Sequence, residues 1–333
     1  MSSVVDLFAA LKTLSLPIAV ACSGGLDSTA LLHAVSKLPA GTSDTAHTRP
    51  IALHVNHGIH PDSSAWAAQV ARQAHQFRLR FDSEIVLGLH TDMPSLEAAA
   101  RDARHAALRR LCAKHGIKTL LFAHHANDQA ETVLLNLLRG TGLAGVGMPR
   151  TRVLDMGNAS TPTQLVRPWL DVPRAQIEQY ARAHQLNWVE DPSNADTTLR
   201  RNAVRHTLWP VIEQVEPRAL PSLARFADLA LAAHQTESGL ASKLLAAYTA
   251  ANGTLDWYTL CRDEPATIQH ALLRAYLTKH SIRAPSAAQL AAMCQQLNAR
   301  TGDGLRCSLA GFELVFAGRR LQAIKSSKEA NPT

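Results

Sequence analysis

Short apolar runs alternate with helical stretches through the first half of the chain, and this alternation constrains the fold more than any other feature. The apolar runs span residues 17–22, 51–55, 79–86 and 117–123. Helical patterns follow them over residues 28–38, 63–77, 95–115 and 128–138. Strands that alternate with helices form crossover units, so we expect an α/β fold with a doubly wound, mainly parallel sheet. Ligands bind beyond the carboxyl ends of such strands, so the loops after Cys22, Val55 and Ala123 should converge.

The second half of the chain carries a different pattern. Residues 140–164 are rich in Gly, Thr and Pro and predict a mobile loop, and residues 200–215 predict a helix interrupted near Pro210. Further helices are predicted over 175–184, 218–250, 267–279 and 286–297, followed by short strands over 304–308, 312–316 and 320–324. We therefore expect a catalytic domain over residues 1–215, then a helical linker and a small C-terminal α+β domain over residues 216–333.

A glycine-rich hexapeptide lies directly between the first predicted strand and helix. It reads Ser23-Gly24-Gly25-Leu26-Asp27-Ser28. Its two glycines permit close approach by an anion, and the amides at the start of the helix point toward that anion. The carboxylate of Asp27 would repel a phosphate alone, so it indicates a Mg²⁺ ligand or a positioning group. The loop lacks the Gly-Lys-Ser/Thr of a Walker A loop and is not G-x-G-x-x-G.

This hexapeptide resembles the signature of the PP-loop superfamily, the N-type ATP pyrophosphatases. Members split ATP between the α- and β-phosphates and transfer AMP to an oxygen. The resemblance implies a sheet of the adenine nucleotide alpha hydrolase-like kind, with ATP and Mg²⁺ as cofactors. It implies that all six residues bind the nucleotide and that Asp27 takes part in catalysis.

Two motifs follow the second and fourth predicted strands. His54-Val55-Asn56-His57-Gly58 comes first, where main-chain groups can meet an adenine and His54, Asn56 and His57 can approach phosphates. The segment from Ala123 to Thr132 contains two histidines and then Asp128 and Glu131, which lie on one helical turn. The two carboxylates can hold the ammonium group of a lysine or a metal ion. His124 and His125 alone do not make a zinc site, because no further ligand has suitable spacing.

Arginines dominate the remaining candidate positions. Arg101 and Arg104 share a helical face with Glu97, which indicates either a surface ion-pair stripe or a site that neutralises phosphate. A Gly-rich stretch beginning at Arg139 predicts a flexible cover over ATP or RNA. The planar guanidinium donates two hydrogen bonds to phosphate. The predicted phosphate or RNA contacts are Arg104, Arg139, Arg167, Arg174, Arg201 and Arg205.

Together these segments resemble the tRNA(Ile)-lysidine synthetase family over residues 16–213, and more weakly over residues 218–325. Many members carry Asp where this chain has Asn127, which puts metal binding at that position in doubt. The resemblance implies that Asp27, Arg101, Asp128 and Glu131 are catalytic. It implies adenylation of the wobble cytidine of a CAU-anticodon isoleucine tRNA, then attack by free L-lysine. It also allows a homodimer.

Composition limits the remaining alternatives. The formal charge of +7 and pI of about 9.4 suit nucleic-acid binding without requiring it. The chain has no apolar run of eighteen residues and no signal-peptide pattern, so we expect a cytoplasmic protein without a membrane span. Five unpatterned cysteines argue against iron–sulfur chemistry. Three alternatives remain: a tRNA thiolation enzyme, a glutamine-fed amide synthetase, or a catalytically silent nucleotide- or RNA-binding module.

Overall fold

The chain divides into two compact units. The computed structural model describes residues 7–14, 17–38, 49–58, 60–88, 96–140, 142–154, 162–280, 282, 285–299, 305–309 and 312–325. Contacts between Cα atoms group Met1–Leu135 with Gly147–Ala227 as the first unit, and Asn136–Val146 with Asp228–Thr333 as the second. The division therefore lies after Ala227, whereas the sequence pattern places the domain boundary after Val215.

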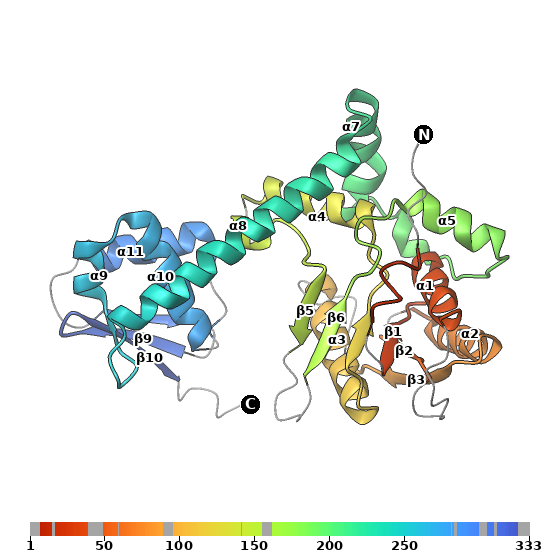
Figure 1. The fold of residues 1–333 in the computed structure, drawn as a ribbon, viewed down its shortest axis with the longest axis horizontal. Coiled ribbons are helices and arrows are strands. Elements are labelled where there is room, and N and C mark those ends of the chain that lie inside the picture. The colour runs from red at the N-terminus through yellow and green to blue at the C-terminus, as the bar shows by residue number, and fades with distance from the viewer. Residues whose placement is uncertain are drawn as a thin grey trace. The chain divides into compact units, whose positions relative to one another are not determined.

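A six-stranded sheet forms the centre of the first unit (Figure 1). Its strand order is β3-β2-β1-β4-β6-β5, and only the edge strand β5 is antiparallel to its neighbour. The strands are β1 (Ile18–Ala21), β2 (Ile51–Asn56), β3 (Arg80–Ile85), β4 (Thr119–Leu121), β5 (Thr151–Leu154) and β6 (Thr163–Val166). This topology confirms the predicted doubly wound, mainly parallel sheet.

The prediction of a mobile loop over residues 140–164 is wrong for its second half. Residues 151–154 and 163–166 form β5 and β6, which pair with each other, and β6 also pairs with β4. Residues 155–161 lie outside the described residues. Each strand has only four residues, so neither carries enough alternation to be recognised locally. Pairing with β4, which is distant in sequence, supplies what the local pattern lacks.

Helices cover both faces of this sheet. One apolar cluster joins the sheet to α1 (Leu26–Ser36), α2 (Ser63–Gln76) and α5 (Arg174–Ala183). A second cluster joins the other face to α3 (Leu96–Lys114). The helix α4 (Ala126–Leu138) follows β4, as predicted. Successive strand residues point to opposite faces of the sheet, so Val20 packs in the first cluster and Ala19 in the second.

The predicted interruption near Pro210 takes the form of a widened turn. Two short helices, α6 (Arg200–Ala203) and α7 (Trp209–Val215), flank a π-helical segment, η3 (Val204–Leu208). Proline has no amide hydrogen and its ring displaces the carbonyl of the preceding turn, so the regular hydrogen-bond ladder cannot pass through it. Short 3-10 turns are η1 (Leu143–Gly145) and η2 (Pro192–Ala195).

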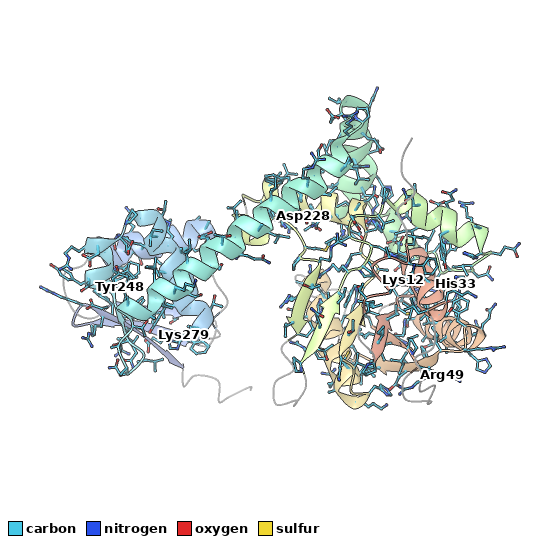
Figure 2. The ribbon with its side chains drawn as sticks, in the orientation of Figure 1. Lys12, His33, Arg49, Asp228, Tyr248 and Lys279 are labelled. Carbon is cyan, nitrogen blue, oxygen red and sulfur yellow. The ribbon has the colours of Figure 1, made fainter. Side chains whose placement is uncertain are left out.

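The second unit contains a four-stranded antiparallel sheet of order β7-β10-β9-β8. Its elements are the end of α8 (Ala219–Tyr248), then β7 (Leu255–Asp256), α9 (Trp257–Asp263), α10 (Ala266–Lys279), α11 (Ala287–Ala299), β8 (Leu305–Leu309), β9 (Phe312–Ala317) and β10 (Arg320–Lys325). Figure 2 labels Tyr248 on α8 and Lys279 on α10. The small α+β domain is confirmed, with β7 and α9 as additions. None of the described helices is long and apolar enough to cross a membrane.

Candidate active site

The loop between β1 and α1 has a backbone shape that requires glycine. Gly24 has a φ of +92°, and a Cβ atom there would lie 3.2 Å from Cγ2 of Val70. Its carbonyl oxygen accepts a hydrogen bond from the backbone N–H of Val189 at 2.9 Å. The positive φ of Gly24, the nearby Val70 side chain and the hydrogen bond from Val189 together hold the loop in one position.

Serine hydroxyls stabilise the same loop by hydrogen bonds within it. The Oγ of Ser28 accepts from the backbone N–H of Gly24 at 3.2 Å and donates to the carbonyl of Gly25 at 3.0 Å. It also lies 3.2 Å from Oγ of Ser23. Gly25 is the N-cap of α1 and supplies no side-chain cap, so the first N–H groups of the helix remain available to an anion. The predicted phosphate-binding loop is therefore preformed.

Asp27 stands in the first turn of α1 with an unsatisfied acceptor. Its Oδ1 is buried and makes no hydrogen bond within the described part of the chain. The nearest cation is Arg174, whose Nε lies 3.8 Å from Oδ1, beyond hydrogen-bonding distance. A buried carboxylate oxygen without a partner is costly unless a cation or donor arrives, so Oδ1 is suited to a ligand.

His125 joins Asp27 to Asp128, a role that its sequence position alone did not predict. The ring is buried, and its Nδ1 accepts the backbone N–H of Asp128 at 3.3 Å. In the neutral imidazole the hydrogen therefore sits on Nε2. That atom lies 3.6 Å from Oδ2 of Asp27 and 3.4 Å from Oδ2 of Asp128. His125 thus presents a donor between two carboxylates, which reduces their mutual repulsion.

The two predicted carboxylates of α4 face two arginines. Arg201 donates from Nη2 to Asp128 Oδ1 at 2.9 Å and from Nε to Glu131 Oε2 at 2.8 Å. Arg205 donates from Nε to Glu131 Oε1 at 2.6 Å and from Nη2 to Oε2 at 3.0 Å. Its Nη2 also lies 3.4 Å from Asp128 Oδ1. Two negative and two positive charges therefore form a closed quartet whose carboxylates are nearly buried.

The groups around Asp128 keep it ionised. Burial acts to raise the pKa of Asp128, but its neighbours, foremost His125 and Arg201, outweigh burial and the net pKa is lowered. The structure brings Asp128, Glu131, Arg201 and Arg205 together, which the sequence did not pair. Lysine binding by the carboxylates and phosphate binding by the arginines stay predictions, and each now requires part of this quartet to exchange partners.

The end of β2 places the next predicted motif at the same sheet edge. His54 is buried and its Nδ1 donates to the carbonyl of Cys22 at 2.8 Å, which leaves Nε2 as an acceptor. Asn56 accepts the backbone N–H of Gly58 at 2.8 Å and so shapes the turn. His57 accepts from Nε of Arg104 at 3.1 Å, and burial together with Arg104 and His54 lowers the pKa of His57 to about 4. The pKa of His57 keeps that ring neutral at pH 7, and burial likewise lowers the pKa of His54.

The buried Arg167 and the half-buried His124 form a second pair. Nε of Arg167 donates to Nδ1 of His124 at 3.1 Å, and Nη1 donates to the carbonyl of Pro149 at 2.6 Å. Burial, with Arg101 and Arg152 nearby, lowers the pKa of Arg167 to about 10, so this arginine stays charged at pH 7. Burial and the neighbouring cations lower the pKa of His124 to about 3, although Asp128 opposes this shift.

Three other predicted positions are placed differently. Arg174 begins α5, and its backbone N–H donates to Oδ1 of Asn127 at 3.0 Å. Asn127 therefore connects the start of α5 to α4. Arg101 is exposed on α3 and makes no ion pair with any described carboxylate. Arg139 is exposed beyond the end of α4 and belongs to the second unit, so it is not placed relative to the other site residues.

Four cysteines with described side chains are held as thiols. Burial raises the pKa of Cys22 far above its ordinary value, and it raises the pKa of Cys112 and of Cys294 to about 12. Burial also raises the pKa of Cys261 to about 11. Thiols act as nucleophiles through the thiolate, so these four side chains are poorly suited to a persulfide mechanism.

Comparison with protein families divides the chain in two. Residues 5–212 match the PP-loop domain, and residues 261–322 match the TilS substrate binding domain. The first match covers the six-stranded sheet and each site residue described above, and it confirms the predicted PP-loop fold and its use of ATP. The thiolation alternative is not favoured.

The chain is also similar to individual proteins. It is 41% identical over 305 residues to a tRNA(Ile)-lysidine synthase of Burkholderia pseudomallei, and the aligned region covers 90% of this chain and 59% of that relative. It is 45% identical over 294 residues to a tRNA(Ile)-lysidine synthase of Ralstonia nicotianae, and the aligned region covers 87% of this chain and 60% of that relative. The chain thus spans about 60% of the length of these relatives. The U34-tRNA thiolase NcsA from Methanococcus maripaludis has a similar fold, with a TM-score of 0.51, 17% identity, and 64% of this chain and 72% of that chain covered.

Proposed function

The chain belongs to the PP-loop family, and from this premise we propose that it is a tRNA(Ile)-lysidine synthase. It would use ATP to join free lysine to C2 of the wobble cytidine in a CAU-anticodon isoleucine tRNA. The preformed loop from Ser23 to Ser28, next to the carboxylates of α4, is the observation that carries this proposal. The matched substrate binding domain and the similar synthases support the choice of tRNA as substrate.

In the first step, the C2 carbonyl oxygen of cytidine attacks the α-phosphate of ATP, which releases pyrophosphate and leaves an adenylated base. Negative charge grows on the phosphate oxygens as the new bond forms. The first N–H groups of α1 would face that position, and the loop that precedes them is already ordered by Ser28. Preorganised donors of this kind stabilise the transition state without further rearrangement.

Mg²⁺ fits the same place. Asp27 offers a buried oxygen that lacks a hydrogen-bond partner, and Mg²⁺ is commonly held by one or two carboxylates together with substrate phosphates. The described residues contain no group of three or more His, Cys, Asp or Glu side chains that could hold a metal alone. Asp27 would therefore hold the ion jointly with ATP, and the ion would neutralise phosphate charge there.

In the second step, the ε-amine of lysine attacks C2, and AMP leaves with the former carbonyl oxygen. The amine must first lose a proton. The Nδ1 atoms of His124 and His125 both accept hydrogen bonds, so each neutral ring carries its hydrogen on Nε2 and cannot take another proton there. A carboxylate of Asp128 or Glu131 is therefore the proposed acceptor, after partial release from the arginines.

The proposed substrates also define the setting. A tRNA and free lysine meet in the cytoplasm, so the enzyme would act there. RNA recognition would rely on phosphate contacts and on a base turned out of the anticodon loop. A homodimer stays a prediction from the family resemblance.

Incorporation of radiolabelled lysine into an unmodified isoleucine tRNA transcript with a CAU anticodon tests the proposal. Label should appear only with Mg²⁺-ATP, and it should disappear when the wobble cytidine is replaced by uridine. The Asp27→Asn enzyme is the matched inactive control. Cleavage of ATP to AMP without lysine incorporation would refute lysidine synthesis and keep only the adenylating activity.

A further inference from the structure

The edge strand β5 places Arg152 on the face of the sheet that α3 covers. Arg152 pairs with Leu165 across the β5–β6 ladder, and cross-strand partners share a face. Leu165 is buried in the cluster beneath α3, as is Leu154, two residues after Arg152 on the same strand. Arg152 itself is exposed, so it lies at the border of this apolar layer.

Other cations border the same layer. Arg101 and Arg104 precede the buried Leu108 by seven and four residues on α3, which is the spacing of one helical face. Arg167 follows Leu165 by two residues and continues the alternation of β6. The apolar layer therefore ends in four arginines from three elements. We call Arg101, Arg104, Arg152 and Arg167 the cationic border.

The arginines of the cationic border interact electrostatically with one another and with a shared neighbour. Burial and then Arg101, Arg104 and Arg152 lower the pKa of His105 to about 4. His105 stacks on Phe122 with ring centroids 5.9 Å apart, and Phe122 stacks on His124 at 5.5 Å. No carboxylate in the described part of the chain forms an ion pair with any of the four arginines. Like charges gathered without acidic partners repel, so a bound polyanion would stabilise them.

The position of β5 separates Arg152 from the loop between β1 and α1. Three strand-to-strand steps lie between β1 and β5 in the sheet, which at about 4.8 Å per step is about 14 Å. A phosphate bound at the loop from Ser23 to Ser28 and a phosphate bound at Arg152 would therefore belong to different places on one ligand or to different ligands. An RNA backbone, with one charge per nucleotide, can reach both.

We propose that Arg152 is an RNA-binding residue that contacts a backbone phosphate of the tRNA from β5, beside Arg101 of α3. This inference rests on the proposed function, because it assumes an RNA substrate. The residue was not among the sequence candidates, since its segment was predicted to be a loop.

Arg150 offers a matched control within the same chain. It lies two residues earlier, but its Nη1 is 3.4 Å from Oδ1 of Asp171 and 3.5 Å from the carbonyl of Pro168, so its charge is already engaged. The variants are Arg152→Gln, Arg150→Gln and the charge-retaining Arg152→Lys. Each is titrated with the unmodified CAU isoleucine tRNA transcript at several KCl concentrations, and ATP affinity is measured on the same preparations.

We expect Arg152→Gln to raise the Kd for tRNA about three- to tenfold, which corresponds to the loss of one hydrogen bond of ordinary strength at an exposed site. The slope of log Kd against log salt should fall by about 0.7–1, the loss of one phosphate contact. Arg150→Gln should stay within about twofold of the wild type, and Arg152→Lys should keep the wild-type slope. ATP affinity should not change.

Three results would overturn the inference: an unchanged Kd and slope in Arg152→Gln, an equal loss in Arg150→Gln, or a parallel loss of ATP affinity. A matching thermal unfolding midpoint in all variants excludes misfolding as the cause. The lysine incorporation assay on the wild-type enzyme judges the proposed function separately. A wild type that binds the transcript but incorporates no lysine refutes that function and leaves the Arg152 contact to be decided by the salt slopes.

Discussion

Replacing Glu131 with glutamine tests the charge quartet most directly. The Glu131 side chain is only 4% exposed, and it accepts hydrogen bonds from both arginines at 2.6–3.0 Å. Glutamine keeps the shape of the side chain, but it removes the charge and turns an N–H₂ group toward one guanidinium. The arginines would then have only Asp128 as an ionised partner.

The cost follows from the burial of each partner. Removing one member of a fully buried ion pair costs about 3–5 kcal/mol. The side chains of Arg201 and Arg205 are 33% and 29% exposed, so water compensates in part. We therefore expect Glu131→Gln to lower the free energy of unfolding by about 2–3 kcal/mol. At about 2–4 °C per kcal/mol for a unit of this size, the thermal midpoint should fall by about 4–12 °C.

Equilibrium urea unfolding of Glu131→Gln, Arg205→Gln and the double variant measures the pairwise part of this cost. The two single changes should couple by about 1–2 kcal/mol, because each removes the same ion pair. Coupling below about 0.5 kcal/mol would refute the quartet as a stabilising unit. A large stability loss with an unchanged KM for lysine would place Glu131 in the scaffold rather than in lysine binding.

Three further outcomes are expected. Asp27→Asn should abolish tRNA-dependent pyrophosphate release. The thermal midpoint of this variant should stay within about 2 °C of the wild type, because the change removes one unsatisfied acceptor. Near-normal turnover would remove Asp27 from the mechanism. Gly24 has a φ of +92°, and a Cβ there would lie 3.2 Å from Val70 Cγ2, so Gly24→Ala should lower the free energy of unfolding by about 1–2 kcal/mol and weaken ATP binding. Gly253 has a φ of +81° but lies in open space, so Gly253→Ala should lower stability without changing ATP affinity. Burial, with Lys37 and His184 nearby, lowers the pKa of His33 to about 4; Figure 2 labels this residue on α1. The folded state therefore keeps the ring neutral, while the unfolded chain takes up a proton below pH 6.5. Stability should therefore be full above pH 6.5 and fall by about 2–3 kcal/mol toward pH 4, and urea unfolding of His33→Gln should show a flatter pH profile.

Much of the fold could be predicted from local patterns. The runs at residues 18–21 and 51–56 are strands because mainly apolar residues are buried on both faces of a parallel sheet. The convergence of the loop at Ser23, the histidine at 54 and the carboxylate at 128 then follows from topology, because parallel strands end at one edge.

The segment containing β5 and β6 could not be predicted in the same way. These four-residue strands are stabilised by pairing: β6 pairs with the distant β4, and β5 pairs with β6. Pairing between segments leaves no periodic trace in the sequence. Arg152 was missed for this reason, since only the ladder shows which face it shares.

The chain sequence by itself determined the α/β class, the glycine-rich loop between β1 and α1 and the PP-loop family, because these depend on residues that are close together in the chain. Tertiary structure alone decided the partners of the charged groups. Asp128 and Glu131 meet Arg201 and Arg205 across about seventy residues, and His125 bridges Asp27 and Asp128. Electrostatic pairing depends on distance and burial in space, and neither quantity is encoded by spacing along the chain.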